Sequence, residues 1–295
     1  MGYAIDYFNA SDRLRPDVWA AQREAEGWDA LGVGDHIRLD GRWAFHSFAC
    51  LGAMAVTTER VSLATMFADS VVRSPIEFAQ FALTMQTLSN GRFEAGIGAG
   101  WFDGDAELAG VRNLTASIRA RRYRESVTII REAFAGSSTF EGEFYSVLLP
   151  DWGPIADPPP LFAAVGGAWG ATHIAPLVDR IEVSPGMIAL RGVPDFARLR
   201  SITREDVLSL VEMARSANPQ AVVGVGMFVG VGDDPSIDGI RSVLGDCFLG
   251  QFYGPAAQVA DALRALHEET AVDRVSVLAV FEGNAEAIAS ELFAP

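Results

Sequence analysis

Short strand-like runs alternate with amphipathic segments along nearly the whole 295-residue chain. Eight strands are expected, at residues 4–8, 29–33, 61–65, 93–97, 161–165, 179–183, 222–229 and 275–280. Helices are expected between and after them, at residues 16–26, 45–57, 75–88, 118–134, 203–215, 256–269 and 285–292. Strands that alternate with helices pair in parallel, and eight such units predict a closed (β/α)₈ TIM barrel of the α/β class.

The chain is longer than a minimal barrel of about 250 residues. The excess lies in two insertion segments, at residues 136–160 and around residues 233–255. The first is rich in Gly, Pro and aromatic residues and should form a surface loop or a small hairpin. Neither resembles a linker, so a single domain spanning residues 1–295 is expected. A doubly wound open sheet is the alternative, but the glycines at 96–100 lack the last glycine of G-x-G-x-x-G and follow the fourth strand.

The composition of the chain disfavours several classes of binding partner. A formal net charge of −15, from 38 acidic and 23 basic residues, disfavours nucleic acid and anionic membranes, because both require a basic surface. No window reaches about 18 uninterrupted apolar residues, and the N-terminus has no signal-peptide pattern, so a cytoplasmic protein without a transmembrane helix is expected. Two cysteines cannot build a disulfide framework, and no zinc or iron motif occurs, so no metal is expected.

Glycine-rich turns follow two of the expected strands. In the first turn, Gly98, Ala99 and Gly100 precede Trp101 at the end of the fourth strand, where ligands of barrel enzymes bind. The absence of a Cβ lets a ligand approach the backbone. The second turn, Val165-Gly166-Gly167, ends the fifth strand and opens a helix, whose N–H groups could hold a phosphate. Together the turns indicate the two ends of one long phosphorylated cofactor.

Chemically versatile residues follow the second and third strands. His36, with Asp35 before it, stands at the expected barrel mouth, where an imidazole suits proton transfer near neutral pH. The alternative is a histidine that only holds a loop, with Asp35 as its partner or as a helix cap. Thr65, Met66 and Phe67 end the third strand and could pave the site of a flat aromatic ligand, or could simply pack in the core.

Taken in order, these motifs resemble the bacterial luciferase-like monooxygenase superfamily of flavin- and deazaflavin-dependent (β/α)₈ enzymes. The resemblance covers most of the chain and rests on residues 26–36, 58–65, 73–101, 107–110, 123–131, 140–145, 165–167, 254–263 and 272–275. It implies that a reduced flavin or coenzyme F420 lies across the barrel mouth, with His36 near the reacting face of its ring.

The resemblance also implies how the cofactor is held. The ring would lie against Met66-Phe67, at a turn that contains a non-prolyl cis peptide in many relatives, so a cis bond is expected there. The loop from Gly98 to Trp101 would run beside the ring or the ribityl chain, and Val165, Gly166 and Gly167 would hold the phosphate. The Asp-His pair after the second strand is typical of F420 users, so coenzyme F420 is expected, with FMN as the alternative.

The expected activity is F420-dependent hydride transfer to, or oxygenation of, a small organic substrate. The alternatives are an FMNH₂-dependent monooxygenase that uses O₂ and a non-catalytic flavin-binding relative. Asp40 stands where some deazaflavin sugar-phosphate dehydrogenases have Trp, and residues 172–179 form a shorter run than usual, so a sugar phosphate is disfavoured. A homodimer is compatible with the sequence. An apolar lining is expected at the mouth, from Trp43, Phe45, Met66, Phe67, Trp101 and Phe102. Few cations are expected there, and the candidates are Arg38, Arg42 and Arg73.

Overall fold

The eight expected strands form one closed parallel barrel. The computed structural model describes residues 2–294 except 9, 11–13, 40, 113, 154, 186–194, 280 and 282. The barrel strands, in order around it, are β1 (Gly2–Tyr7), β2 (Ala30–Val33), β5 (Ser62–Thr65), β7 (Phe93–Gly98), β10 (Leu161–Val165), β11 (Arg180–Val183), β12 (Val222–Val231) and β14 (Arg274–Ala279). Pairing of β10 with β7 and of β14 with β1 closes the sheet. The predicted TIM barrel is therefore confirmed.

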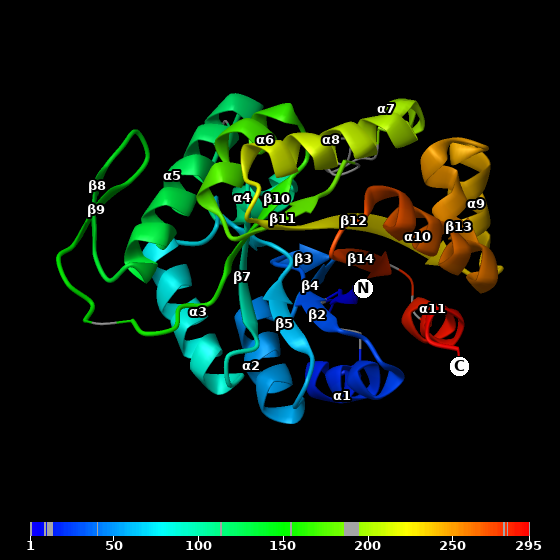
Figure 1. Cartoon of the computed structure of the whole chain (residues 1–295), viewed down its shortest axis with the longest axis horizontal. Coiled ribbons are helices and arrows are strands. Elements are labelled where there is room, and N and C mark those ends of the chain that lie inside the picture. The colour runs from blue at the N-terminus through cyan, green and yellow to red at the C-terminus, as the bar shows by residue number, and fades with distance from the viewer. Residues whose placement is uncertain are drawn as a thin grey trace.

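Helices surround the barrel, as Figure 1 shows. The seven expected ones are α1 (Pro16–Glu26), α2 (Ser47–Thr57), α3 (Pro75–Leu88), α5 (Ala116–Phe134), α8 (Arg204–Ala217), α10 (Ala256–Thr270) and α11 (Asn284–Leu292). Local chemistry sets several of their ends. Helix α1 begins at a proline and stops at Gly27, whose φ of 106° suits glycine. Helix α8 begins with a capping box between Thr203 and Asp206.

Shorter elements follow several strands and, apart from α6, whose start after Gly167 was expected, they were not predicted. They are α4 (Asp103–Leu108), α6 (Ala168–His173), η1 (Ala175–Leu177) and α7 (Phe196–Ser201), with the two-residue strands β3 (Arg38–Leu39), β4 (Arg42–Trp43) and β6 (Ala68–Asp69). These elements are too short to show a clear period in the sequence. Three of them, α4, α6 and β6, carry residues that line the site described below.

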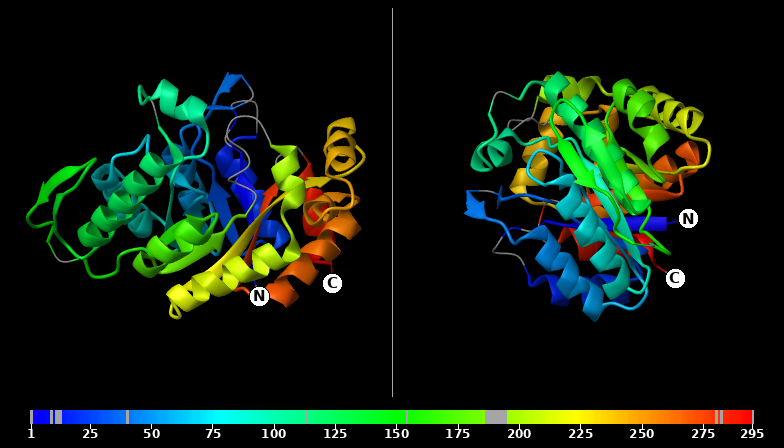
Figure 2. Two further views of the ribbon diagram at one scale, coloured as in Figure 1. Left: turned by 90° about the horizontal axis from the view of Figure 1, so that it is seen from above. Right: turned by 90° about the vertical axis from the view of Figure 1, so that its left-hand side faces the viewer.

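The two insertion segments lie on opposite sides of the barrel (Figures 1 and 2). The first, expected to be a surface loop or a small hairpin, forms a hairpin from β8 (Ser138–Glu141) and β9 (Ser146–Leu149). The second forms helix α9 (Pro235–Leu244), the 3₁₀ helix η3 (Phe248–Phe252) and strand β13 (Tyr253–Gly254), which pairs with β12. Within the described residues, no helix combines the length and hydrophobicity needed to span a bilayer.

A charged network crosses the barrel interior. Glu94 on β7 accepts two hydrogen bonds from Arg274 on β14, at 2.9 and 2.8 Å, and Arg180 on β11 lies 3.3 Å from the same carboxylate. These strands are not neighbours in the sheet, so the side chains meet through the middle of the barrel. The apolar core lies mainly between the strands and the helices, around residues such as Ile5, Leu63 and Val277.

Candidate active site at the barrel mouth

A cavity of about 730 Å³ opens at the carboxyl ends of the barrel strands. Its volume is within the usual range for small-molecule sites, about 300–1,000 Å³. All but two of the predicted site residues line it, and those that do are Asp35, His36, Met66, Phe67, Gly98, Ala99, Gly100, Trp101, Gly166 and Gly167. Segments far apart in the sequence therefore meet here, as the barrel fold requires.

Thr65 and Val165 are fully buried and are not among the described lining residues. The Thr65 hydroxyl donates to the carbonyl of Gly96 at 2.5 Å. Val165 packs beneath helix α6, where a Cβ on Gly170 would lie 3.3 Å from its side chain. Side chains along a strand alternate between two faces, so these two point away from the cavity that their neighbours line.

The peptide bond between Met66 and Phe67 is cis, as predicted. The glycines of β7 make room for this turn. A Cβ on Gly96 would lie 1.8 Å from the carbonyl oxygen of Thr65, and one on Gly98 would lie 3.1 Å from the Cβ of Phe67. These glycines therefore let the turn at Met66-Phe67 pack closely against β7. This role of the glycines was not predicted from the sequence.

Gly100 makes room for a neighbouring acid. Its φ is +72°, and a Cβ there would lie 2.3 Å from the Asp69 carboxylate. Asp69 lines the cavity, and its Oδ1 accepts a hydrogen bond from the Val71 amide at 2.7 Å. Burial raises the pKa of Asp69 to about 6. Asp69 was not predicted, although its place just after the third strand was a usable signal.

His36 is held by an acid that was also not predicted. Its Nδ1 lies 2.8 Å from Oδ2 of Asp105 on helix α4. Asp105 is 1% exposed, and its Oδ1 accepts hydrogen bonds from the backbone amides of Ile37 and Arg38. The partner of His36 at Nδ1 is thus Asp105, not Asp35. The His36 ring also meets Trp101 edge-on, with centroids 5.4 Å apart.

Asp35 belongs to a different group of contacts. It accepts hydrogen bonds from Arg73 at 2.7 and 3.0 Å, from the Ser47 hydroxyl at 2.6 Å and from the Asp69 amide at 3.1 Å. Burial alone would raise the pKa of Asp35, but Arg73 and the other donors outweigh it and hold the pKa below its usual value. A carboxylate with four donors is suited to positioning the loop rather than to carrying protons.

The predicted mouth residues divide into two groups. Met66, Phe67, Trp101 and Phe102 line the cavity, whereas Trp43 and Phe45 are not among its described lining residues. Asp40 lies outside the described residues. Arg38, Arg42 and Arg73 were the expected cations. The arginines in the described lining are instead Arg119 and Arg121. Arg119 pairs with Asp103 and Arg121 with Glu143, so their charges are matched within the protein.

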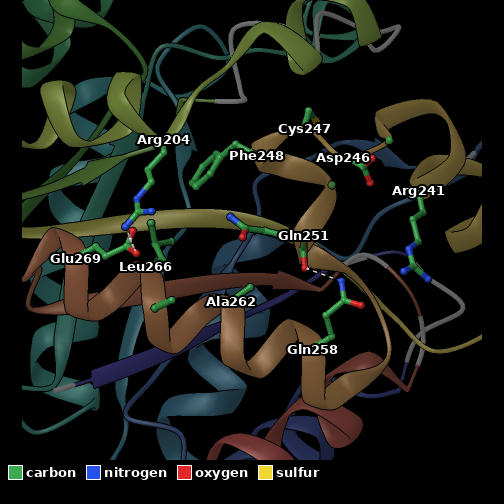
Figure 3. Close-up of a pocket in the computed structure, with 13 residues that line it drawn as sticks. Arg204, Arg241, Asp246, Cys247, Phe248, Gln251, Gln258, Ala262, Leu266 and Glu269 are labelled. Carbon is green, nitrogen blue, oxygen red and sulfur yellow. Dashed lines mark hydrogen bonds and ion pairs between the residues drawn. The ribbon is translucent and has the colours of Figure 1, made fainter.

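A second cavity, of about 390 Å³, lies outside the barrel beside η3 and α10 (Figure 3). Figure 3 shows Arg204 paired with Glu269 at one end and the Gln258 amide directed at the carbonyl of Gln251, a distance of 3.5 Å. None of the predicted site residues is in its described lining. The barrel-mouth cavity is therefore the candidate active site.

Comparison with known families agrees with this geometry. The model of the luciferase-like monooxygenase family matches residues 18–190, which is more than half of the chain. The chain belongs to the luciferase-like monooxygenase family. The matched segment includes all of the predicted site residues and the cis peptide, so the resemblance seen in the sequence is confirmed.

Curated relatives in this family differ in cofactor. An F420-dependent glucose-6-phosphate dehydrogenase of Amycolatopsis mediterranei is 31% identical over 155 residues, or 50% of this chain and 46% of the relative. The chain thus spans about half of that relative's length. A protein of the same name from Kribbella flavida is 27% identical over 76% of this chain and 72% of the relative. The oxygenase component of the flavin-dependent trigonelline monooxygenase of Acinetobacter baylyi is 28% identical over 40% of this chain and 33% of the relative.

Solved structures show the same fold. An F420-dependent secondary alcohol dehydrogenase, in complex with an F420–acetone adduct, superposes with a TM-score of 0.72 at 18% identity and covers 99% of this chain and 97% of its own. The oxygenating constituent of 3,6-diketocamphane monooxygenase from Pseudomonas putida, in complex with FMN, has a TM-score of 0.69 at 15% identity, over 98% and 96%. At these identities the likeness concerns the fold alone.

Proposed function

We propose that this chain is an F420-dependent oxidoreductase that acts by hydride transfer on a small organic substrate. The observation that carries the proposal is His36, hydrogen-bonded to the buried Asp105, in the wall of a largely apolar cavity at the barrel mouth. F420-dependent relatives support the cofactor, as does the Asp35-His36 pair.

The cavity fits a cofactor of this kind. The glycines of β7 allow the Met66-Phe67 turn to form one face of the cavity, where a Cβ on Gly96 could not be accommodated. Met66 and Phe67 would support the ring, the loop from Gly98 to Trp101 would flank it, and Gly166 and Gly167 would hold the phosphate. When bound in its reduced form, the cofactor would supply the hydride.

His36 would exchange the proton that accompanies this transfer. Asp105 engages Nδ1 and so orients the ring, which directs proton exchange with a substrate to Nε2. The edge-on contact with Trp101 also restrains the ring. A fixed position within hydrogen-bond reach of the substrate is a requirement for an effective acid–base group.

The lining favours a moderately apolar substrate over a sugar phosphate. Phe67, Ala99, Trp101, Phe102 and Leu278 contribute apolar surface. Both arginines of the described lining are already paired, whereas a phosphate requires a cluster of charge-assisted donors. The proposal therefore differs from the substrate in the names of the two F420-dependent relatives.

An FMNH₂-dependent monooxygenase that uses O₂ is the second candidate, supported by the sequence similarity of part of the chain to the oxygenase component of the flavin-dependent trigonelline monooxygenase. Titration of the purified protein with F420 and with FMN, followed by fluorescence, tests both. Ketones, enones and glucose 6-phosphate would then be assayed with the reduced cofactor, with and without O₂. We expect tighter binding of F420 and oxygen-independent turnover of a ketone or an enone.

Each other outcome of this experiment has a distinct meaning. Turnover only with FMN and O₂ would establish the monooxygenase, and preferential use of glucose 6-phosphate would overturn the assignment of the substrate. Binding without turnover of any substrate class would indicate a non-catalytic relative. Failure to bind either cofactor would refute the proposed function.

A further inference from the structure

Two buried acids that the proposed mechanism does not use line the inner part of the cavity. Asp6 on β1 is 5% exposed and Glu182 on β11 is 1% exposed. The Ser276 hydroxyl donates to Oε2 of Glu182, but Oε1 of Glu182 and Oδ1 of Asp6 have no hydrogen-bond partner among the described residues. A buried carboxyl oxygen without a partner destabilises a fold, so such a group usually has another role.

Glycines on the neighbouring strands leave space for these two acids. A Cβ on Gly32 would lie 2.2 Å from Oδ1 of Asp6, and one on Gly226 would lie 2.5 Å from Oε1 of Glu182. The same position on Gly32 is 2.3 Å from Cγ of Met66. Asp6 therefore lies beside the residue that begins the cis peptide.

The surrounding charges leave one acid without a matching cation. Arg180 and Arg274 both interact with Glu94 and with Glu182, so two cations face two of the three acids. Burial, followed by the charge of Glu182, raises the pKa of Asp6 well above its ordinary value. Burial also raises the pKa of Glu182 to about 7, although Ser276 and the arginines oppose it. Because two carboxyl groups in one buried site disfavour double ionisation, the pair favours a state with one donor and one acceptor.

We propose that Asp6 and Glu182 form an imide-binding subsite, in which one acid accepts a hydrogen bond from an N–H group and the other donates to an adjacent carbonyl. This proposal rests on the proposed function, because the ring systems of F420 and FMN share such an edge, an N–H between two carbonyls. The position of Asp6 beside Met66 places the pair next to the surface assigned to the ring. A carboxylic acid is complementary to an imide, since each has a donor adjacent to an acceptor.

The test compares FMN with N3-methyl-FMN, which lacks the N–H donor, in titrations of the whole protein followed by flavin fluorescence. The wild type should bind the methylated form about 10- to 100-fold more weakly, as expected for a hydrogen bond that involves a charged group. Asp6→Leu and Glu182→Met should each weaken FMN binding by at least about tenfold and should reduce the effect of methylation. Glu182→Gln keeps a donor and an acceptor, so it should bind FMN within about threefold of the wild type.

Asp261→Asn is the control, because Asp261 pairs with Arg264 on α10, neither residue is in the described lining, and the change should not alter FMN binding. Equal affinity of the wild type for FMN and N3-methyl-FMN would overturn the proposal without the need for any variant, and would leave the proposed function intact. Unchanged FMN binding by folded Asp6→Leu and Glu182→Met would do the same. If the wild type binds neither FMN nor F420, the proposed function fails first and this subsite fails with it.

Discussion

Asp35 and Glu182 are buried carboxyl groups that line the same cavity in opposite states. Four hydrogen bonds from Arg73, Ser47 and the Asp69 amide satisfy Asp35, and its pKa is lowered. Glu182 has a single donor and one oxygen without a described partner, and its pKa is raised. The difference separates acids that stabilise the barrel mouth from acids that are kept available for a ligand.

His36 should show the largest effect, because it lines the cavity and is assigned the proton exchange with the substrate. His36→Ala is expected to lower turnover by about 10²–10⁴-fold while changing cofactor affinity far less. The measurement is steady-state kinetics together with a fluorescence titration. His173→Ala is the control, because His173 lies on α6 and is not in the described lining. Full activity of His36→Ala would mean that His36 is only structural.

Breaking the ion pair between Asp35 and Arg73 should chiefly lower the stability of the fold. Arg73→Met leaves a carboxylate that is 1% exposed without its cation, and this should lower the free energy of unfolding by about 3–5 kcal/mol. Urea denaturation measures the loss, which should be largely reversed in the double variant Asp35→Leu/Arg73→Met. Arg121→Met, which breaks an exposed pair, should have a far smaller effect on the free energy of unfolding. An equal effect of the two arginines would contradict the comparison.

The same ion pair should depend on pH in a defined direction. The pKa of Asp35 in the folded protein lies below its reference value of 3.8. Its contribution to stability is therefore present above about pH 4 and is lost as the pH falls through the folded-state value. Denaturation of the wild type between pH 3 and pH 6 should show this loss, and Asp35→Leu/Arg73→Met should show less of it.

The contribution of Glu182 to stability should change with pH in the opposite direction. Between its reference pKa of 4.5 and its folded-state value of about 7, the folded protein binds more protons than the unfolded chain, so stability falls as the pH rises. Glu182→Gln should therefore be more stable than the wild type at pH 8, by about 1–3 kcal/mol, and nearly equal to it at pH 5. Urea denaturation at both values tests this. A loss of stability at both would show that the carboxylate is satisfied after all.

The smallest effect is expected in the outer cavity beside η3. Gln258→Ala should change the free energy of unfolding by less than about 0.5 kcal/mol and leave cofactor affinity unchanged. A titration with FMN and F420 checks this directly. A clear loss of affinity would mean that the two cavities are coupled and would weaken the assignment of the site to the barrel mouth alone.

Local patterns were sufficient to predict the barrel and much of its mouth. The eight strands could be recognised in the sequence, because strands that are buried on both faces form continuous apolar runs. Their ends could then be placed at one edge, since parallel strands share a direction, and this brought His36, Met66 and Gly98 to the cavity. The turn-rich composition of residues 136–160 predicted a surface loop or a small hairpin, and the structure has a hairpin at residues 138–149. Trp43 and Phe45 were assigned to the mouth by position alone, and neither is in the described lining.

Partners across the barrel were decided only by the tertiary structure. Asp105 reaches His36 over 69 positions, and the Glu94–Arg274 pair spans 180. Charged residues within the apolar strands, such as Asp6 and Glu182, were visible in the sequence, but their common cavity was not. The order of side chains along a strand determines which residues face inward. Which inward residues meet depends on closure and register, which are set by contacts between distant segments.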